Sequence, residues 1–150
     1  MDAKSLLEQI RSPEDLRRLP ANELESLAKE VRARIIETVS RNGGHLSPSL
    51  GAVELTIALH RVFHSPEDKI LWDVGHQSYA HKLLTGRGER FASLRKFDGL
   101  CGFCRPEESE HDAFISGHAG NTISAAMGFS VANQLAGKND HVVAVVGDGA

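Results

Sequence analysis

Residues 142–146, Val-Val-Ala-Val-Val, lead directly into Gly147-Asp148-Gly149. A continuous apolar run rich in Val is typical of a strand that is covered on both faces of a parallel sheet. Ligands of open parallel sheets bind at the carboxyl ends of the strands, where Asp148 follows. Its carboxylate suits Mg²⁺, which also takes phosphate oxygens, and the glycines let the backbone approach an anion closely. Gly-Asp-Gly by itself is also typical of a tight turn, but after this strand it predicts half of a diphosphate and metal site.

Composition and charge indicate a globular protein and argue against nucleic-acid-binding and membrane-bound classes. The chain has 150 residues, 41% of them hydrophobic and 25% charged, which is ordinary for a soluble globular domain. A net charge of −3 gives no electrostatic surface for nucleic acid or for an anionic membrane. The sequence has no apolar run of about 18 residues and no secretory signal at its start, so we expect a cytoplasmic protein.

The first half of the chain predicts helices. Ser12-Pro13-Glu14-Asp15 is a capping box that opens a short helix to about residue 19. A longer helix is expected over about 22–41, because apolar residues recur at steps of three and four, and Gly43 ends it. We expect a loop over 45–50 and a second helix over about 50–63.

The second half predicts strands that alternate with helices. The expected elements are a strand at 69–73, a helix at 78–84, a loop-rich region at 86–117, a helix at 121–136 and a strand at 141–146. The small residues of the last helix predict close approach to a sheet. Alternation of this kind indicates an α/β fold in which helices flank a parallel sheet. Because only two strands are clear, the fold class predicted is an incomplete domain.

Three glycine-rich loops carry histidine, and each lies beside the end of a predicted element. They contain Gly44-His45, Gly75-His76 and Gly117-His118. A helix N-terminus preceded by glycine offers N–H donors and the positive end of the helix dipole, which suit phosphate. A single Gly-His pair is usually a cap or an exposed residue, but three such loops together with Gly-Asp-Gly favour a binding site. The other five histidines are expected to be structural.

Cys101 and Cys104 form a lone Cys-x-x-Cys. Only His111 is an obvious further ligand, so a four-ligand zinc site is incomplete. The neighbouring Gly and Pro residues are typical of an irregular loop, which does not suit a redox motif at a helix N-terminus. We therefore expect two free thiols.

Several segments together resemble the N-terminal region of the 1-deoxy-D-xylulose-5-phosphate synthases, a family of transketolase-like thiamin-diphosphate enzymes. The most specific pair is Gly-His-Leu at 44–46, before a Val-Glu-Leu-Thr helix, and Trp-Asp-Val-Gly-His-Gln at 72–77. The resemblance covers the chain from about residue 10 to its end. The matching segments, in the family's order, are residues 40–46, 51–60, 70–77, 81–86, 108–112, 117–118 and 146–150.

The resemblance implies roles for individual residues. Asp148 is similar to the aspartate that binds Mg²⁺ beside the cofactor. His45 resembles the histidine that stands over the reactive carbon of the thiazolium ring and assists proton transfers. The residues that would contact thiamin diphosphate are His76, Gly117, His118, Ala119, Gly149 and Ala150. Where the family often has Ser-Ser-Thr-Ser after the histidine, this chain has Ala119-Gly120-Asn121-Thr122, which keeps the backbone N–H groups and loses hydroxyls.

The implied reaction joins pyruvate to D-glyceraldehyde 3-phosphate, releases CO₂ and gives 1-deoxy-D-xylulose 5-phosphate, the first step towards isoprenoid precursors and a source for thiamin and pyridoxal. The resemblance also implies a homodimer. Residues 1–150 would be the N-terminal part of the diphosphate- and magnesium-binding domain, cut within that domain. The family's Asn-Asn metal ligands and its activating glutamate are absent from these residues, so this chain alone is expected to be inactive.

Two alternatives remain open on the sequence. The first is a transketolase that acts on sugar phosphates, which belongs to the same superfamily. The second is a non-catalytic fragment or split subunit that needs a partner chain, because an unpaired sheet edge would recruit one.

Overall fold

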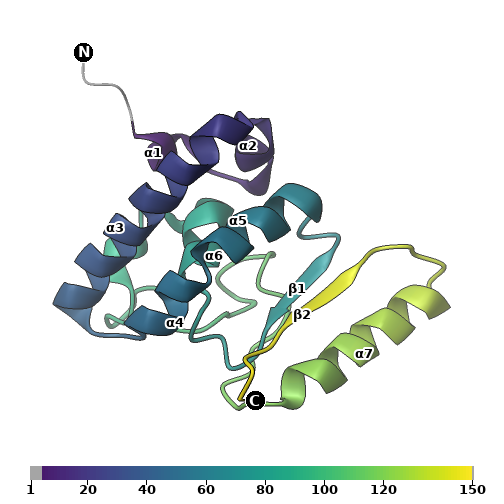
Figure 1. Ribbon diagram of the computed structural model, residues 1–150. Helices are drawn as coiled ribbons and strands as arrows, with labels where there is room; N and C mark the ends of the chain where they lie inside the picture. Colours follow the sequence, from purple (N-terminus) through teal and green to yellow (C-terminus); the bar gives the residue numbers. More distant parts are fainter. Residues whose placement is uncertain (1–4, 150) are drawn as a thin grey trace. The chain divides into compact units, whose positions relative to one another are not determined.

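The computed structural model describes residues 5–149 and divides them into two compact units (Figure 1). The first unit takes the chain up to Val62 together with Gln77–Gly102. The second unit takes Phe63–His76 together with the chain from Phe103 onward. Over the described range 5–149, no helix is both long enough and apolar enough to cross a membrane.

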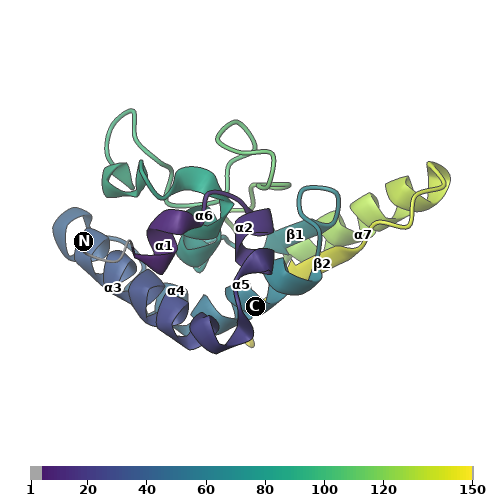
Figure 2. The same cartoon turned by 90° about the horizontal axis from the view of Figure 1, so that it is seen from above.

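The first unit is helical (Figures 1 and 2). Its α-helices are α1 (Leu6–Gln9), α2 (Pro13–Arg18), α3 (Leu24–Asn42), α4 (Leu46–Gly51), α5 (Val53–Val62) and α6 (Tyr79–Lys82). Short turns of other helix types occupy Ala21–Glu23, Leu83–Arg87 and Phe91–Ser93. The predicted capping box is confirmed, because the Asp15 N–H donates to the Ser12 hydroxyl and the Asp15 carboxylate accepts from the Ser12 N–H.

Helix α3 supplies the central apolar face of this unit. Leu27, Val31 and Ile35 are completely buried, and their spacing of four places them on one side of the helix. This face packs against α1, α5 and α6. The helix ends as predicted at Gly43, which has φ of +73° and donates its N–H to the Val39 carbonyl at 2.8 Å.

Two local predictions for the first unit are corrected. The loop expected over 45–50 is mostly helical, because α4 spans Leu46–Gly51. Pro48 is tolerated there since it lies in the first helical turn, where its missing N–H costs no hydrogen bond. Helix α1 was not expected, since four residues are too few to show a helical period. The Ser5 hydroxyl caps α1 by accepting the Glu8 N–H at 3.4 Å.

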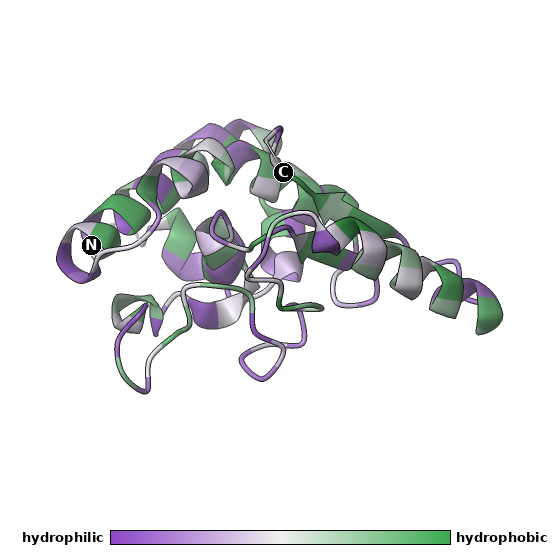
Figure 3. Ribbon diagram, turned by 90° about the horizontal axis from the view of Figure 1, so that it is seen from below, coloured by the Kyte–Doolittle hydropathy of each residue, from purple (hydrophilic) through white to green (hydrophobic). Residues whose placement is uncertain are grey.

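The second unit contains the parallel sheet. Strands β1 (Lys69–Trp72) and β2 (Val142–Val145) pair in parallel, with Lys69 opposite Val142 and Trp72 opposite Val145. Helix α7 (Asn121–Leu135) packs against both strands. Hydrophobic residues run along the strands and along α7 (Figure 3). The predicted α/β class with a parallel pair and a flanking helix is therefore confirmed.

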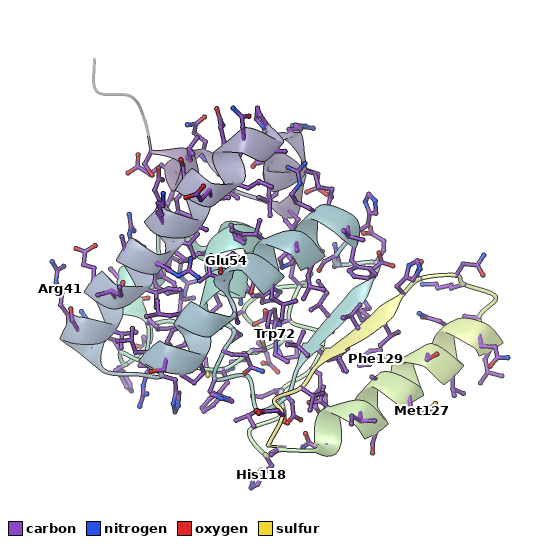
Figure 4. All side chains as sticks on the ribbon, viewed as in Figure 1. Arg41, Glu54, Trp72, His118, Met127 and Phe129 are labelled. Atoms are coloured by element: carbon purple, nitrogen blue, oxygen red, sulfur yellow. The ribbon has the colours of Figure 1, made fainter. Side chains whose placement is uncertain are left out.

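The two sides of α7 differ from the expectation that its small residues face the sheet. The half-buried Phe129 lies on the side towards β2, while Met127 lies on the outer side with 66% of its surface exposed (Figure 4). Gly128 is also exposed, and a Cβ built there would meet no atom within 4 Å. Ala125 and Ala126 are half-buried, so only part of the small-residue set is turned inward. Apolar side chains of the outer side are Ile123, Met127, Val131 and Leu135.

The buried face of α3 should dominate the stability of the first unit. Substitution Leu27→Ala should lower the free energy of unfolding by about 2–5 kcal/mol, because it removes apolar contacts and leaves a cavity. Ile36→Ala on the same helix, where the side chain is 46% exposed, is the matched control and should cost much less. Urea unfolding followed by circular dichroism measures both, and equal losses would contradict this account of the core.

Candidate functional site

The parallel pairing brings the ends of two distant segments to one sheet edge. The backbone N–H of Asp73, which follows β1, donates to the carbonyl of Val145, the last residue of β2, at 2.9 Å. Gly147 and Asp148 follow on β2 and are exposed. The N-terminus of α7 lies at the same end (Figure 1). The predicted metal residue and the predicted diphosphate loop therefore share one edge of the second unit.

The loop before α7 is tied to the chain that follows β1. The Gly117 N–H donates to the Val74 carbonyl at 3.3 Å, and the Val74 N–H donates to the Ser116 hydroxyl at 3.3 Å. Gly117 and Gly120 have φ values of +73° and +84°, which glycine adopts without strain. Residues 117–120 are exposed, and His118 lies at this end of the unit (Figure 4).

Asp73 joins the strand to the helix. Its carboxylate is buried, with 2% of the residue exposed, and its two oxygens lie 3.1 and 3.0 Å from the backbone nitrogen of Gly120. A third bond comes from the Thr122 N–H at 3.4 Å. The sequence prediction assigned Asp73 no role. Its place directly after a strand was visible in the sequence, but its contact with a glycine 47 positions away was not.

This contact corrects one expectation about the helix N-terminus. The N–H groups of Gly120 and Thr122 are bonded to Asp73, so they are not free for phosphate. The backbone N–H groups of His118 and Ala119 donate to no residue within the described part of the chain. The loop therefore offers two backbone donors for an anion, at His118 and Ala119.

The electrostatics keep Asp73 ionised. Burial by itself raises the pKa of the Asp73 carboxyl, but the hydrogen bonds from Gly120 and Thr122 and the nearby His76 outweigh burial and hold that pKa below its usual value. His76 is half-buried and belongs to the same unit, so the structure brings it to the edge that carries Asp73. Its contact with a cofactor stays a prediction.

The backbone between β1 and His76 has an unusual conformation. Val74 has φ of +60°, a left-handed value that is rare for a β-branched residue. Gly75 has φ of +89°, and a Cβ there would lie 3.3 Å from the Cys104 nitrogen. Rare backbone conformations cluster at functional sites, which is a second reason to place a site at this edge.

His45 belongs to the first unit and is described with it. It is exposed and precedes α4, and its backbone N–H donates to the Tyr79 hydroxyl at 3.3 Å. Gly44 is needed beside it, because a Cβ there would lie 2.7 Å from that hydroxyl. The proposed proton-transfer role of His45 stays a prediction.

The remaining histidines and the cysteines have structural settings. Cys101 and Cys104 form no disulfide. His111 Nδ1 lies 2.9 Å from the Ser65 hydroxyl. In the first unit, His60 Nε2 and His81 Nδ1 lie 2.8 Å apart between stacked, fully buried rings, a pair that the sequence did not predict.

The donor set at the edge fits a diphosphate with a hard cation. Asp148 offers an exposed carboxylate oxygen, and oxygen ligands are those that Mg²⁺ prefers. Cβ atoms built at Gly117, Gly147 and Gly149 would meet nothing within 4 Å, so the backbone there is open to a ligand. Ala150, the last predicted contact residue, lies outside the described residues.

Comparison with known proteins gives the family of the chain. The family model described as 1-deoxy-D-xylulose-5-phosphate synthase matches residues 7–150. The chain belongs to this family. A Geobacter sulfurreducens protein named 1-deoxy-D-xylulose-5-phosphate synthase 2 is 61% identical over 144 residues, which are 96% of this chain and 23% of the relative.

Other relatives carry the same family name and match a similar share of their length. The synthase of Pelotomaculum thermopropionicum is 60% identical over 97% of this chain. That of Dehalococcoides mccartyi is 57% identical over the whole chain. The chain spans 23% of the length of each of these curated relatives.

The backbone conformations of a loop glycine and a helix glycine predict that substitution by alanine changes the free energy of unfolding in opposite directions. Gly120→Ala should lower the free energy of unfolding by about 1–2 kcal/mol, because alanine is strained at φ of +84°. Gly128→Ala, inside α7 and equally open, should raise it by up to about 1 kcal/mol. Urea unfolding measures both, and a loss of stability in both variants would contradict this reading of the backbone.

Two buried carboxylates of the second unit predict a loss of stability in acid. Asp68 accepts N–H groups of His64 and His141 at 2.7 and 2.6 Å. Burial raises the pKa of Asp68, but these bonds and the His141 side chain outweigh burial and lower it, as the bonds to Asp73 lower the pKa there. Carboxyls with lowered pKa values stabilise the fold fully above the unfolded pKa of about 3.9, and this contribution disappears as pH falls through that value towards the folded pKa.

The unfolding free energy should therefore fall below about pH 4. The double variant Asp68→Asn/Asp73→Asn should be less stable at pH 7 and should lose less stability on acidification. Chemical unfolding at pH 7 and pH 3 tests this, and an unchanged pH dependence in the double variant would show that other groups cause it.

Proposed function

We propose that this chain is the cofactor-binding portion of an enzyme that joins pyruvate to D-glyceraldehyde 3-phosphate, releases CO₂ and forms 1-deoxy-D-xylulose 5-phosphate. The observation that carries the proposal is the shared edge of the second unit. There Gly147-Asp148 and His76 follow the two paired parallel strands, and the loop 117–120 is bonded to the residues after β1. Membership of the synthase family supports the same reaction. A homodimer, which rests on the resemblance, and a cytoplasmic location are also part of this proposal.

The proposed cofactors are thiamin diphosphate and Mg²⁺. Asp148 would supply an oxygen ligand to the metal, and the backbone of Gly149 and Ala150 would contact the diphosphate. The N–H groups of His118 and Ala119, which have no acceptor among residues 5–149, would donate to diphosphate oxygens, since the N–H groups of Gly117 and Gly120 are already bonded within the protein. When bound, thiamin diphosphate supplies the carbanion chemistry that cleaves and forms bonds to the pyruvate carbonyl carbon.

Two histidines have different proposed tasks. His76 follows the left-handed residues 74 and 75 and would orient the cofactor by a hydrogen bond from its ring. His45, exposed before α4, would donate a proton to a substrate carbonyl oxygen or take one from it.

An assay with two donors tests the proposed reaction against the transketolase alternative. Purified protein, in the form that its source cell produces, is supplied with thiamin diphosphate, Mg²⁺ and D-glyceraldehyde 3-phosphate. Release of CO₂ from pyruvate, together with 1-deoxy-D-xylulose 5-phosphate, is the expected result. Turnover of a ketose phosphate without use of pyruvate would overturn the proposal in favour of a transketolase.

The metal role of Asp148 gives a separate prediction. Asp148→Asn should weaken Mg²⁺-dependent binding of thiamin diphosphate by at least about 10-fold, the lower end of what loss of even an outer-shell metal partner costs. Glu67→Gln, an exposed carboxylate of the same unit before β1, is the matched control and should leave affinity unchanged. Calorimetry with Mg²⁺ and with EDTA measures both, and equal affinities for Asp148→Asn and the unsubstituted protein would remove Asp148 from the metal site.

A further inference from the structure

The carboxylate of Asp73 is in contact with the loop to which the proposed function assigns the diphosphate. We propose that Asp73 is a positioning residue for that diphosphate: it fixes the loop 117–120 so that the N–H groups of His118 and Ala119 stay available to an anion. This inference rests on the proposed function, and it assigns the donors to the loop itself. No part of it requires Asp73 to touch the ligand.

The loop is fixed on both sides of its two free donors. On one side, the Gly117 N–H is bonded to the Val74 carbonyl at 3.3 Å. On the other side, the Gly120 N–H is bonded to both oxygens of Asp73 at 3.1 and 3.0 Å. Only His118 and Ala119 lie between these fixed points. Since Val74 and Asp73 are adjacent residues after β1, one rigid strand end holds both sides of the loop.

Ser116 adds a third connection to the same strand end. Its hydroxyl oxygen accepts the Val74 N–H at 3.3 Å. The same oxygen lies 2.6 Å from the His118 carbonyl and 2.6 Å from the Asn121 side-chain oxygen, so its one proton can be donated to either. This hydroxyl orients the His118 peptide group from the carbonyl side and leaves its neighbouring N–H groups unbonded.

The position of the negative charge explains why the carboxylate is stable where it lies. Asp73 accepts N–H groups of Gly120 and Thr122, which open α7, and a negative charge is favoured at the N-terminus of a 15-residue helix. In this way two of the N–H groups that open α7 are bonded within the protein. The N–H groups of His118 and Ala119 stay available to an anionic ligand at this edge.

The same unit contains a matched control for Asp73. Asp68 is also buried, also accepts two backbone N–H groups and also has a lowered pKa. It precedes β1, whereas Asp73 follows it, so the two carboxylates occupy opposite ends of one strand. A substitution at Asp68 removes comparable hydrogen bonds without touching the loop 117–120.

Binding separates the positioning role from a merely structural one. Asp73→Asn and Asp68→Asn are prepared in the protein as its gene encodes it, and affinity is measured by calorimetry for thiamin diphosphate with Mg²⁺ and for inorganic diphosphate with Mg²⁺. Both variants should lose stability. Asp73→Asn should lower both affinities about tenfold, equivalent to about 1.4 kcal/mol, and Asp68→Asn should leave both within about twofold. Amide hydrogen exchange should rise at Gly120 and Thr122 only in Asp73→Asn.

The outcomes distinguish the inference from the function beneath it. If Asp73→Asn binds like the unsubstituted protein, or if Asp68→Asn loses as much affinity, the positioning role is overturned and the proposed function stands. If the unsubstituted protein binds neither ligand, the proposed function falls and the inference falls with it. Should Asp73→Asn fail to fold, Ser116→Ala decides: a loss of about threefold in affinity supports the fixed loop, and unchanged affinity overturns it.

Discussion

Parallel pairing of β1 and β2 is the constraint on which the second unit depends. Parallel strands place their carboxyl ends at one edge, and their connection must be long enough to return the chain to the opposite edge. Here about seventy residues separate Lys69 from its partner Val142. Once the pair forms, the segment after β1 and the segment after β2 necessarily lie side by side at the same edge of the sheet. The proposed metal residue, Asp148, and the loop that Asp73 holds thus become neighbours because of strand direction, and helix α7 supplies the return path that brings the second strand into register.

Two aspartates convert this pairing into a defined geometry. Asp68 accepts hydrogen bonds from backbone N–H groups where the strands begin, and Asp73 accepts them where α7 begins. Each carboxylate joins segments that are distant in the chain, so each contributes more to the arrangement than its number of hydrogen bonds suggests. Both depend on remaining ionised, and their lowered pKa values show that backbone donors compensate for burial. Ionisation of these two carboxylates makes the unit sensitive to acid. At neutral pH, the same ionised groups hold the backbone of the proposed site in place by hydrogen bonds.

Sequence periodicity predicted those elements whose formation is local. The capping box at Ser12, the end of α3 at Gly43, both strands and the span of α7 follow from residues within a few positions of each other. Helix α4 was missed because Ser, Pro and Gly are typical of loops, whereas here they occupy the first turn and end of a short helix. Asp73 was missed for a different reason: its partners lie 47 and 49 positions away, and no local pattern encodes such a contact. Site residues were therefore predicted where glycine and histidine form motifs, whereas the contacts of Asp73 are visible only in the three-dimensional structure.

The loop also explains how its sequence can differ from the family pattern quoted above without loss of its proposed task. Within residues 5–149, the backbone N–H groups of His118 and Ala119 have no acceptor, and these donors do not depend on hydroxyl side chains. A hydroxyl at position 119 or 120 would add a donor, but it is not needed to expose these two. Glycine suits position 120 better than other residues, because it adopts φ of +84° without strain while its N–H reaches both oxygens of Asp73. Where the family often has serine, glycine at this position lacks the side-chain donor but adopts the left-handed backbone without strain. Under the proposed function, recognition of an anion at this edge would depend on how firmly the backbone is held, and Asp73 would matter more here than in a loop that also offers hydroxyl groups.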